Sequence, residues 1–423
     1  ITASIEFAGY FQNGSSPNDL QFGDDAVICV ILDGSPHNIA DGLMVPASAA
    51  DAVQIGISGL AFSGFTHGAV SLYGGSGHNV SGSRIGGFVG GISLDPVGNG
   101  IIVGPGVHNV TIGGDPSAYG LRNIIGSATG GGIVLDGPNG TDVAAHDNQI
   151  INNFIGVGWN VANGTYTNRG NGGPGVVVAG PNNDVESNLI EYNGGYGVEL
   201  TGVNANSCKV EYNSIGFLGS YTDAGSGNLS GIVVQNDAHD NQLEFNAIWF
   251  NTGTGVRIVN GRNNTIFDNQ IFSNGGLGID LAEAGVTQIA NDSMPPTLDY
   301  ANAGRHFPVI TSAIGGHTNG TFSGTLYTTP GTHYVELFLS SSCDPSGYGE
   351  GEFPFTNFPV TTSGPILLGQ AEATFSVQSP YPVGLVGNPF VTAVAIDSSG
   401  NTSEFSKCFT YVDDTVFADG FGN

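Results

Sequence analysis

Glycine followed by alternating apolar residues recurs along the middle of the chain. Each copy reads glycine, apolar, any residue, apolar, and the last steps between copies are 24 and 23 residues long. Two steps are longer, at 43 and 34 residues. Self-similarity at a period of about 20 to 50 residues indicates a solenoid. The copies begin at Gly132, Gly175, Gly197, Gly231, Gly255 and Gly278.

Asparagines are locked to this repeat at intervals of five residues. Each last asparagine precedes its glycine by four residues, and short apolar alternations lie between the asparagines. Asparagine tolerates left-handed backbone. We therefore expect the asparagines to take this conformation at corners between short strands, with their amides bonded along a stack. The three sets are Asn183, Asn188, Asn193; Asn241, Asn246, Asn251; and Asn264, Asn269, Asn274.

Short strands joined by such corners predict the coils of a right-handed parallel β-helix. Successive coils rise by one strand spacing, about 4.8 Å, and only stacking buries their apolar faces. The longer steps hold insertions after Ile155 and Ile215, which we expect as loops on one side. The inward columns are aliphatic throughout: Val198, Ile232, Val256, Ile279; Leu200, Val234, Ile258, Leu281; and Ile190, Ile215, Ile248, Ile271.

The repeat stops at about Phe307, where longer alternating strands begin, separated by Gly, Pro and Ser. Several strands spaced by turn signals predict a β-sandwich, which would cap the open end of the helix. The chain is therefore predicted to be all-β. Its expected parts are N-terminal strands or a cap at 1–50, the β-helix at 51–300, the sandwich at 305–412 and a flexible tail at 413–423.

Three segments resemble secreted bacterial right-handed β-helix repeat proteins that end in an Ig-like module. They read NNFIGVGWNVANGTYTNRGNGGPGVVV, NGGLGIDL and CDPSGYGEGE…AIDSSGNTSEFSKC. The resemblance covers roughly residues 50–410. It implies the fold and secretion, and says little about activity because the group is broad.

Charge narrows the range of partners. The net charge is −28, with eight Lys and Arg in total. Neutralising nucleic acid needs clustered Lys and Arg, so nucleic acid and anionic membrane are poor partners, and we expect no binding of nucleic acid. Acidic polysaccharides are repelled unless a cation such as Ca²⁺ bridges them. No apolar run reaches the ~20 residues of a membrane helix. The low charge and the few, even cysteines favour a secreted or cell-surface protein.

The four cysteines give one expected disulfide. Cys343 and Cys408 both lie in the C-terminal domain and are a plausible pair. Cys29 and Cys208 are far apart in sequence; they could pair, stay free or bond to another subunit. Spacing does not decide between these alternatives.

One outward column of the repeat carries like charges. It is expected to contain His146, Glu186, Glu211, Glu244 and Phe267. Stacked glutamates raise one another's pKa, and two carboxylates about 5 Å apart suit a retaining glycosidase. Their oxygens could instead hold Ca²⁺, or form a solvated face eased by Lys209.

Aromatic residues and one arginine are candidate ligand-binding groups. Trp249 lies on an outward aromatic column, and three further residues lie on the insertions. Their rings could stack on sugars or pack under loops. Arg257 adjoins Asp280 on the next coil; it forms either a salt bridge or a clamp for a substrate carboxylate. The insertion residues are Trp159, Tyr166 and Tyr221.

Two functions remain open on these residues. The first is an extracellular surface or matrix protein that self-assembles or binds glycans without catalysis and needs no cofactor. The second is a polysaccharide lyase or glycoside hydrolase with a groove along the helix, using Glu186, Glu211 and Glu244. The signatures of β-helix lyases and pectin hydrolases are mostly missing, with no Arg-x-Lys motif in the chain. This favours the first function.

Overall fold

The structure is a computed structural model. It describes residues 3–90, 92–137, 143–217, 225–282, 285–286, 300–316, 318–363, 370–380 and 389–413. Within these ranges the chain forms β-strands and short 3-10 helices, and no helix is long and apolar enough to cross a membrane. Two compact units are present, residues 1–238 with 250–252 and residues 239–249 with 253–423.

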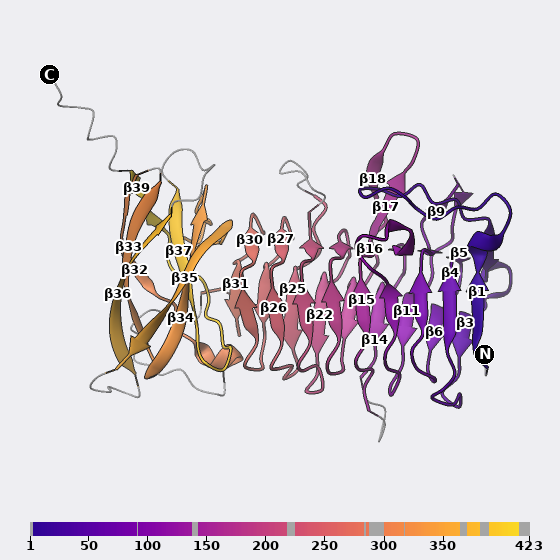
Figure 1. The fold of residues 1–423 in the computed structure, drawn as a ribbon, viewed down its shortest axis with the longest axis horizontal. Helices are drawn as coiled ribbons and strands as arrows, with labels where there is room; N and C mark the ends of the chain where they lie inside the picture. Colours follow the sequence, from indigo (N-terminus) through magenta and orange to yellow (C-terminus); the bar gives the residue numbers. More distant parts are fainter. Residues whose placement is uncertain are drawn as a thin grey trace. The chain divides into compact units, whose positions relative to one another are not determined.

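The helical part contains three parallel sheets, each with nine strands in the described residues (Figure 1). Each coil contributes one strand to each sheet. In the first unit the first sheet holds β1 (Ile5–Ala8), β4 (Ile55–Ser58), β7 (Asn79–Ser81), β12 (Thr111–Gly113), β15 (Gln149–Ile151), β20 (Asp184–Glu186) and β23 (Lys209–Glu211). The second holds β2 (Val30–Asp33), β5 (Leu60–Ser63), β8 (Arg84–Ile85), β13 (Ile124–Ile125), β16 (Phe154–Ile155), β21 (Leu189–Ile190) and β24 (Ser214–Ile215). The third holds β3 (Asp41–Val45), β6 (Gly68–Leu72), β11 (Asn99–Val103), β14 (Ile133–Leu135), β19 (Val176–Val178), β22 (Val198–Thr201) and β25 (Ile232–Gln235).

The second unit contains two more coils of the same kind. Their strands are β26 (Gln242–Glu244), β27 (Ala247–Trp249) and β28 (Val256–Ile258), then β29 (Thr265–Phe267), β30 (Gln270–Phe272) and β31 (Ile279–Leu281). The predicted parallel β-helix is confirmed, down to the pairing of its inward columns. Val198 pairs with Ile232, and Val256 pairs with Ile279. All four side chains are at most 2 % exposed.

Stacked asparagine side chains form ladders that satisfy the hydrogen-bonding groups of the backbone at the corners. The Nδ2 of Asn153 donates to Oδ1 of Asn188 at 3.0 Å, and the Nδ2 of Asn188 donates to Oδ1 of Asn213 at 3.0 Å. The same oxygens accept the backbone N–H groups of Asn153 and Asn188 at 2.9 and 3.0 Å. Each ladder side chain therefore takes up a buried corner N–H that no strand partner reaches. Further ladders link Asn171, Asn193, Asn228 and Asn251, and, in the second unit, Asn241 with Asn264.

The left-handed corner residue differs from the one predicted. The residue before the ladder asparagine takes positive φ, as at Ser187 (56°) and Tyr192 (57°), whereas Asn188 and Asn193 do not. The ladder asparagine needs ordinary backbone to aim its amide along the stack. The left-handed turn therefore falls one residue earlier, even on bulky side chains such as Phe245 (57°) and Phe250 (55°).

Two four-stranded sheets form the C-terminal β-sandwich. One orders β36 (Ala371–Pro380), β33 (Asn319–Thr328), β32 (Val309–Gly315) and β39 (Val412–Asp413). The other orders β35 (Phe353–Thr362), β34 (Gly331–Ser340), β37 (Phe390–Ile396) and β38 (Phe409–Thr410). Their core includes Phe322, Leu326, Val335, Leu337 and Tyr411. The Ig-like character stays a prediction, and residues 414–423 of the predicted tail lie outside the described residues.

Buried glutamates of the sandwich bind the last coil within the second unit. Glu350 accepts the N–H groups of Ser273 and Asn274 at 2.8 and 3.0 Å. Glu336 and Glu404 accept those of Asp268 and Leu281 at 3.1 and 3.0 Å. The three glutamates are 6 %, 2 % and 1 % exposed, respectively. They supply acceptors that a further coil would otherwise provide.

The cysteines fall into two classes. Cys343 and Cys408 form a disulfide bond, with their Cα atoms 6.1 Å apart. Cys29 and Cys208 are both reduced thiols, outside that disulfide bond. Cys208 is buried, and burial raises its pKa to about 12. Among the alternatives for these two cysteines, this leaves only Cys29, which is exposed, positioned to reach another chain.

Replacing Asn188 by alanine tests the ladder. The substitution removes the acceptor of the Asn153 N–H and the amide donor to the carbonyl of Ile150, both buried, at about 1–3 kcal/mol for each group. We expect the free energy of unfolding to fall by on the order of 3 kcal/mol, measured by chemical denaturation. Asn163→Ala, in an exposed loop, is the control and should change little. Equal effects of the two substitutions would remove the ladder as the stabilising feature.

The buried glutamates that bond the last coil predict that stability depends on pH. Burial raises the pKa of Glu350 to about 7 and that of Glu336 to about 8, from 4.5 in the unfolded chain. The folded state therefore binds more protons than the unfolded state between pH 4.5 and these values, so stability decreases as pH rises through that window. The thermal midpoint should be lower at pH 8.5 than at pH 5.5.

Glu350→Gln provides the matched test. It removes the titrating group and should make the midpoint less dependent on pH over the same range. Glu372→Gln, at an exposed position of β36, should keep the wild-type dependence. A midpoint in Glu350→Gln that varies with pH as steeply as in the wild type would contradict the assignment.

Candidate functional site

The predicted glutamate column lies in the first sheet. Glu186 ends β20 and Glu211 ends β23, and the two residues are paired in register, about one strand spacing apart. In β15 the partner of Glu186 is Ile151. The expected position of His146 in this column is therefore wrong, because His146 belongs to the corner that precedes β15. Its ring instead stacks on that of His108, with centroids 4.9 Å apart.

Neighbouring charges affect this pair. Burial, followed by the carboxylates of Glu211 and Asp184, raises the pKa of Glu186, and Lys209 lowers it. The Nζ of Lys209 lies 4.0 Å from Oε1 of Glu211. Across the described ranges, no group of three or more His, Cys, Asp or Glu side chains is arranged to hold a metal ion. Calcium at the column stays a prediction.

Glu244 lies in the second unit, at the end of β26. Its register partner is Phe267, as predicted. Its charge contributes, after burial and Asp268, to the raised pKa of Glu336 in the sandwich. The third glutamate of the column therefore lies in the electrostatic environment of the cap.

Three of the predicted ligand-binding residues have structural contacts instead. Trp249 packs on Phe272 at 4.3 Å between ring centroids and is only 5 % exposed, so the expected outward aromatic column is buried. Of the two roles considered for Arg257, the structure shows the salt bridge, from Nε to Oδ2 of Asp280 at 3.5 Å. Tyr166 packs against a buried apolar cluster. Tyr221 lies outside the described residues.

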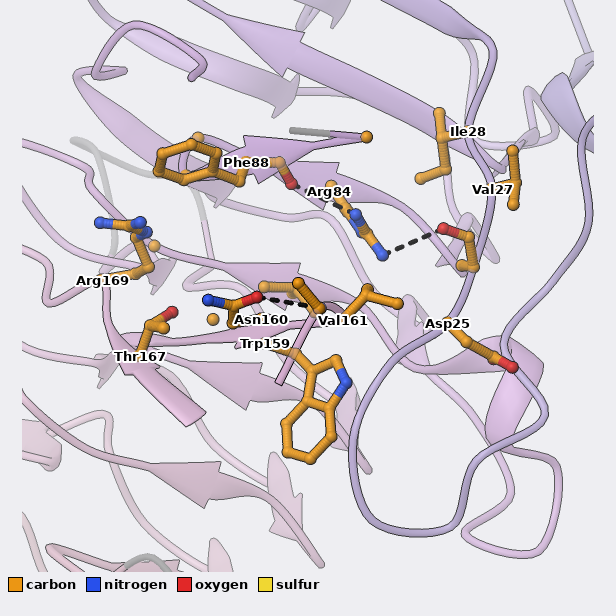
Figure 2. A pocket seen from close by; sticks show the side chains of 18 residues that line it. Asp25, Val27, Ile28, Arg84, Phe88, Trp159, Asn160, Val161, Thr167 and Arg169 are labelled. Atoms are coloured by element: carbon orange, nitrogen blue, oxygen red, sulfur yellow. Dashed lines mark hydrogen bonds between the residues drawn. The ribbon is translucent and has the colours of Figure 1, made fainter. Parts of the chain in front are cut away.

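Trp159 lies at a cavity of about 640 Å³ within the first unit. Three segments build this cavity: residues 25–28, the hairpin of β9 (Phe88–Val89) and β10 (Ile92–Ser93), and the hairpin of β17 (Val157–Asn160) and β18 (Thr165–Asn168). We call it the hairpin cavity. Figure 2 shows Phe88, Arg169 and Thr167 on one side of it, and Asp25, Val27 and Ile28 on the other.

Two arginines hold the N-terminal segment in place. Arg84 forms a buried ion pair with Asp24 and donates to the carbonyls of Ala26 and Phe88 at 3.1 and 3.2 Å. Burial raises the pKa of Asp24, and Arg84 offsets part of that rise. Arg122 donates to the carbonyls of residues 20, 21 and 23 at 3.3, 3.1 and 3.0 Å. This wall of the cavity is therefore fixed by charge-assisted bonds.

The β17–β18 hairpin carries Trp159 opposite Tyr166, with their ring centroids 5.0 Å apart. The insertion predicted after Ile155 is this hairpin. Trp159 fits closely because Gly23 has no side chain: a Cβ there would lie 2.6 Å from the indole. Trp159 is partly exposed and lines the cavity.

Arg169 follows the hairpin and lies over Phe88, with its guanidinium carbon 4.3 Å from the ring centroid. Two glycines make room for its stem. A Cβ at Gly158 would lie 2.8 Å from Cγ of Arg169, and one at Gly126 would lie 2.8 Å from Cβ. The stem is therefore held while the guanidinium remains at the cavity (Figure 2).

Reading the sequence identified Trp159 but not the rest of this cavity. Asp24 and Asp25 lie before the first glycine repeat, so the repeat register says nothing about their side chains. The available signal was the position of arginines: three of eight basic residues, Arg84, Arg122 and Arg169, belong to coils next to the first insertion.

Comparisons with known proteins agree with the architecture. Residues 167–294 match the family model described as a right-handed β-helix region. The chain folds as a right-handed parallel β-helix. The family model covers less than half of this β-helix protein, and comparison with curated proteins found no match.

Several solved β-helix structures are similar at low identity. The A-module of mannuronan C-5 epimerase AlgE6 of Azotobacter vinelandii is 15 % identical, with 64 % of this chain and 66 % of that chain covered and a TM-score of 0.37. An alginate lyase of Paenibacillus is 15 % identical, with 66 % and 98 % covered and a TM-score of 0.31. The tailspike protein 2 domain of bacteriophage CBA120 is 11 % identical, with 95 % and 80 % covered and a TM-score of 0.27. Likeness at this level carries no argument about activity.

Proposed function

We propose that this β-helix is an extracellular glycan-binding protein that holds a sugar in the hairpin cavity without chemical turnover. The observation that carries the proposal is the cavity itself. Its volume of about 640 Å³ falls within the ~300–1,000 Å³ of typical ligand pockets. A rigid solenoid carries the three segments that form it, so the site is preorganised.

The lining suits a sugar. The rings of Phe88 and Trp159 offer apolar surface for the C–H face of a pyranose. Asn160, Thr167 and Asp25 line the same space with amide, hydroxyl and carboxylate groups, which can bond sugar hydroxyls. Phe88 is 41 % exposed, so part of its ring surface is accessible to a ligand.

A surface with few charged residues supports an extracellular role. Only 10 % of the residues are charged, against about 25 % in average soluble domains. Self-association through Cys29 or through the sides of the solenoid is compatible with this surface, and it remains part of the proposal as a way to present many cavities at once.

Phe88→Ala and Trp159→Ala test the cavity. Each should reduce binding of oligosaccharides on a glycan array by at least tenfold, since stacking surface is lost while the coils stay intact. Tyr334→Ala removes an aromatic ring that is 51 % exposed on the sandwich, and it should bind as the wild type does. Circular dichroism checks the fold of each variant. Unchanged binding by both cavity variants would refute a sugar site there.

Catalysis at the glutamate column is the second candidate. Glu186 pairs in register with Glu211, and burial and the Glu211 charge raise its pKa, which is the direction of shift that a general acid needs. If the column is catalytic, Glu186→Gln and Glu211→Gln should each reduce polysaccharide cleavage by about 10²-fold or more. Glu372→Gln should retain full activity. Product release that persists in both column variants would exclude this candidate.

A further inference from the structure

We infer that the hairpin cavity selects a glycan bearing an isolated anionic substituent, a carboxylate or a sulfate, and that Arg169 binds it. This inference rests on the proposed glycan-binding function and adds the class of sugar. The argument depends on how the positive charges of this region are used.

In two of the three arginines of this region, the guanidinium already bonds groups of the protein. Arg84 is 6 % exposed and is neutralised by Asp24. Arg122 is 8 % exposed, and its guanidinium nitrogens donate to three backbone carbonyls and to Oδ1 of Asn152. Both therefore serve to build the cavity wall, and neither has its charge available to a ligand.

Arg169 is used differently. Within the described residues Arg169 forms no ion pair. By contrast, Arg84, Arg257 and Arg305 each form one with an aspartate. The contact of its guanidinium is the face of Phe88 at 4.3 Å. A cation–π contact of this kind covers one face of the planar group and leaves its N–H edges available. Those edges match the two oxygens of a carboxylate or sulfate.

The position of this charge fits a substituent on a sugar ring. Arg169 and Phe88 lie on one side of the cavity, and Trp159 is part of the same lining (Figure 2). A pyranose against the aromatic surface could therefore direct an anionic group at the guanidinium. Partial burial strengthens such a pair relative to one in open water.

Net charge limits the ligand further. With a net charge of −28, the whole protein repels long polyanions, and the repulsion accumulates with every charge along the polymer. A glycan with sparse anionic groups meets that repulsion once and gains the contact with Arg169. This favours acidic residues separated by neutral sugars, or an acidic terminal residue, over a homopolymer of uronic acid.

A glycan array with matched oligosaccharides provides the test. It should hold neutral oligosaccharides, the same chains with one glucuronate, their carboxyl-reduced forms, chains with one sulfate, and oligouronates. The wild type should bind a singly charged chain at least tenfold more tightly than its carboxyl-reduced form. The glucuronate and sulfate arms distinguish the two anions, and oligouronates should bind less well than singly charged chains.

Arg169→Gln should abolish this preference, so that acidic and reduced chains bind equally. Arg169→Lys should keep part of it, because the charge remains but the planar fork is lost. The thermal midpoints of both variants should match the wild type, which separates a loss of recognition from a loss of fold. Affinity of the wild type for the acidic chain should also fall as NaCl is raised.

The two proposals fail in different ways. If the wild type binds neutral chains best, or if Arg169→Gln keeps the preference for acidic chains, the role of Arg169 is wrong while a sugar site stands. If no oligosaccharide binds, or binding survives both Phe88→Ala and Trp159→Ala, the glycan site itself is wrong. In that case the inference about Arg169 is lost with it.

Discussion

The demand that every buried corner N–H find an acceptor governs this fold. Within a coil the strands are only two to five residues long, so a coil alone cannot bond its own backbone. Strand groups find partners one coil away, and corner groups find the amide of the asparagine stacked above, as Asn153, Asn188 and Asn213 show. Because each asparagine both donates and accepts, one side chain per corner satisfies the ladder and fixes the register of the aliphatic columns with it.

The same demand recurs at the last coil. Asn302 continues the ladder at the corner of Asn264, and carboxylates from the sandwich serve other groups of this edge: Glu350 bonds two corner N–H groups, and Glu336 and Glu404 bond one each. A carboxylate accepts more bonds than an amide oxygen, but burying its charge raises its pKa. The sandwich therefore satisfies backbone N–H groups of the last coil, and in doing so it buries acidic side chains.

From the sequence we could predict the features that repeat with each coil, such as the inward columns. Features that do not repeat, such as the contacts of the hairpins, could mostly not be predicted. Inward columns such as Val198–Ile232 could be assigned because period and side-chain direction follow from one strand. Trp249 shows the limit: its direction out of the coil was deducible, but its covering by Phe272 and other groups was not. The corner geometry was misassigned because asparagine suits both a left-handed turn and a ladder, and only the stack shows which role wins. The Arg84–Asp24 pair joins residues 60 positions apart, with no local pattern to reveal it.

Recognition in a solenoid belongs where the repeat is broken. Regular coils repeat the same buried aliphatic columns and asparagine ladders, so one stretch of coil resembles the next and offers little to a selective ligand. The N-terminal segment and the two hairpins interrupt that uniformity, and three of eight basic residues lie beside them. Two of these arginines, Arg84 and Arg122, donate their hydrogen bonds to the irregular segments and hold them in place. Arg84 bonds the carbonyl of Phe88, and the ring of Phe88 contacts the third arginine, Arg169. A charge held in place before the ligand arrives costs less to order on binding.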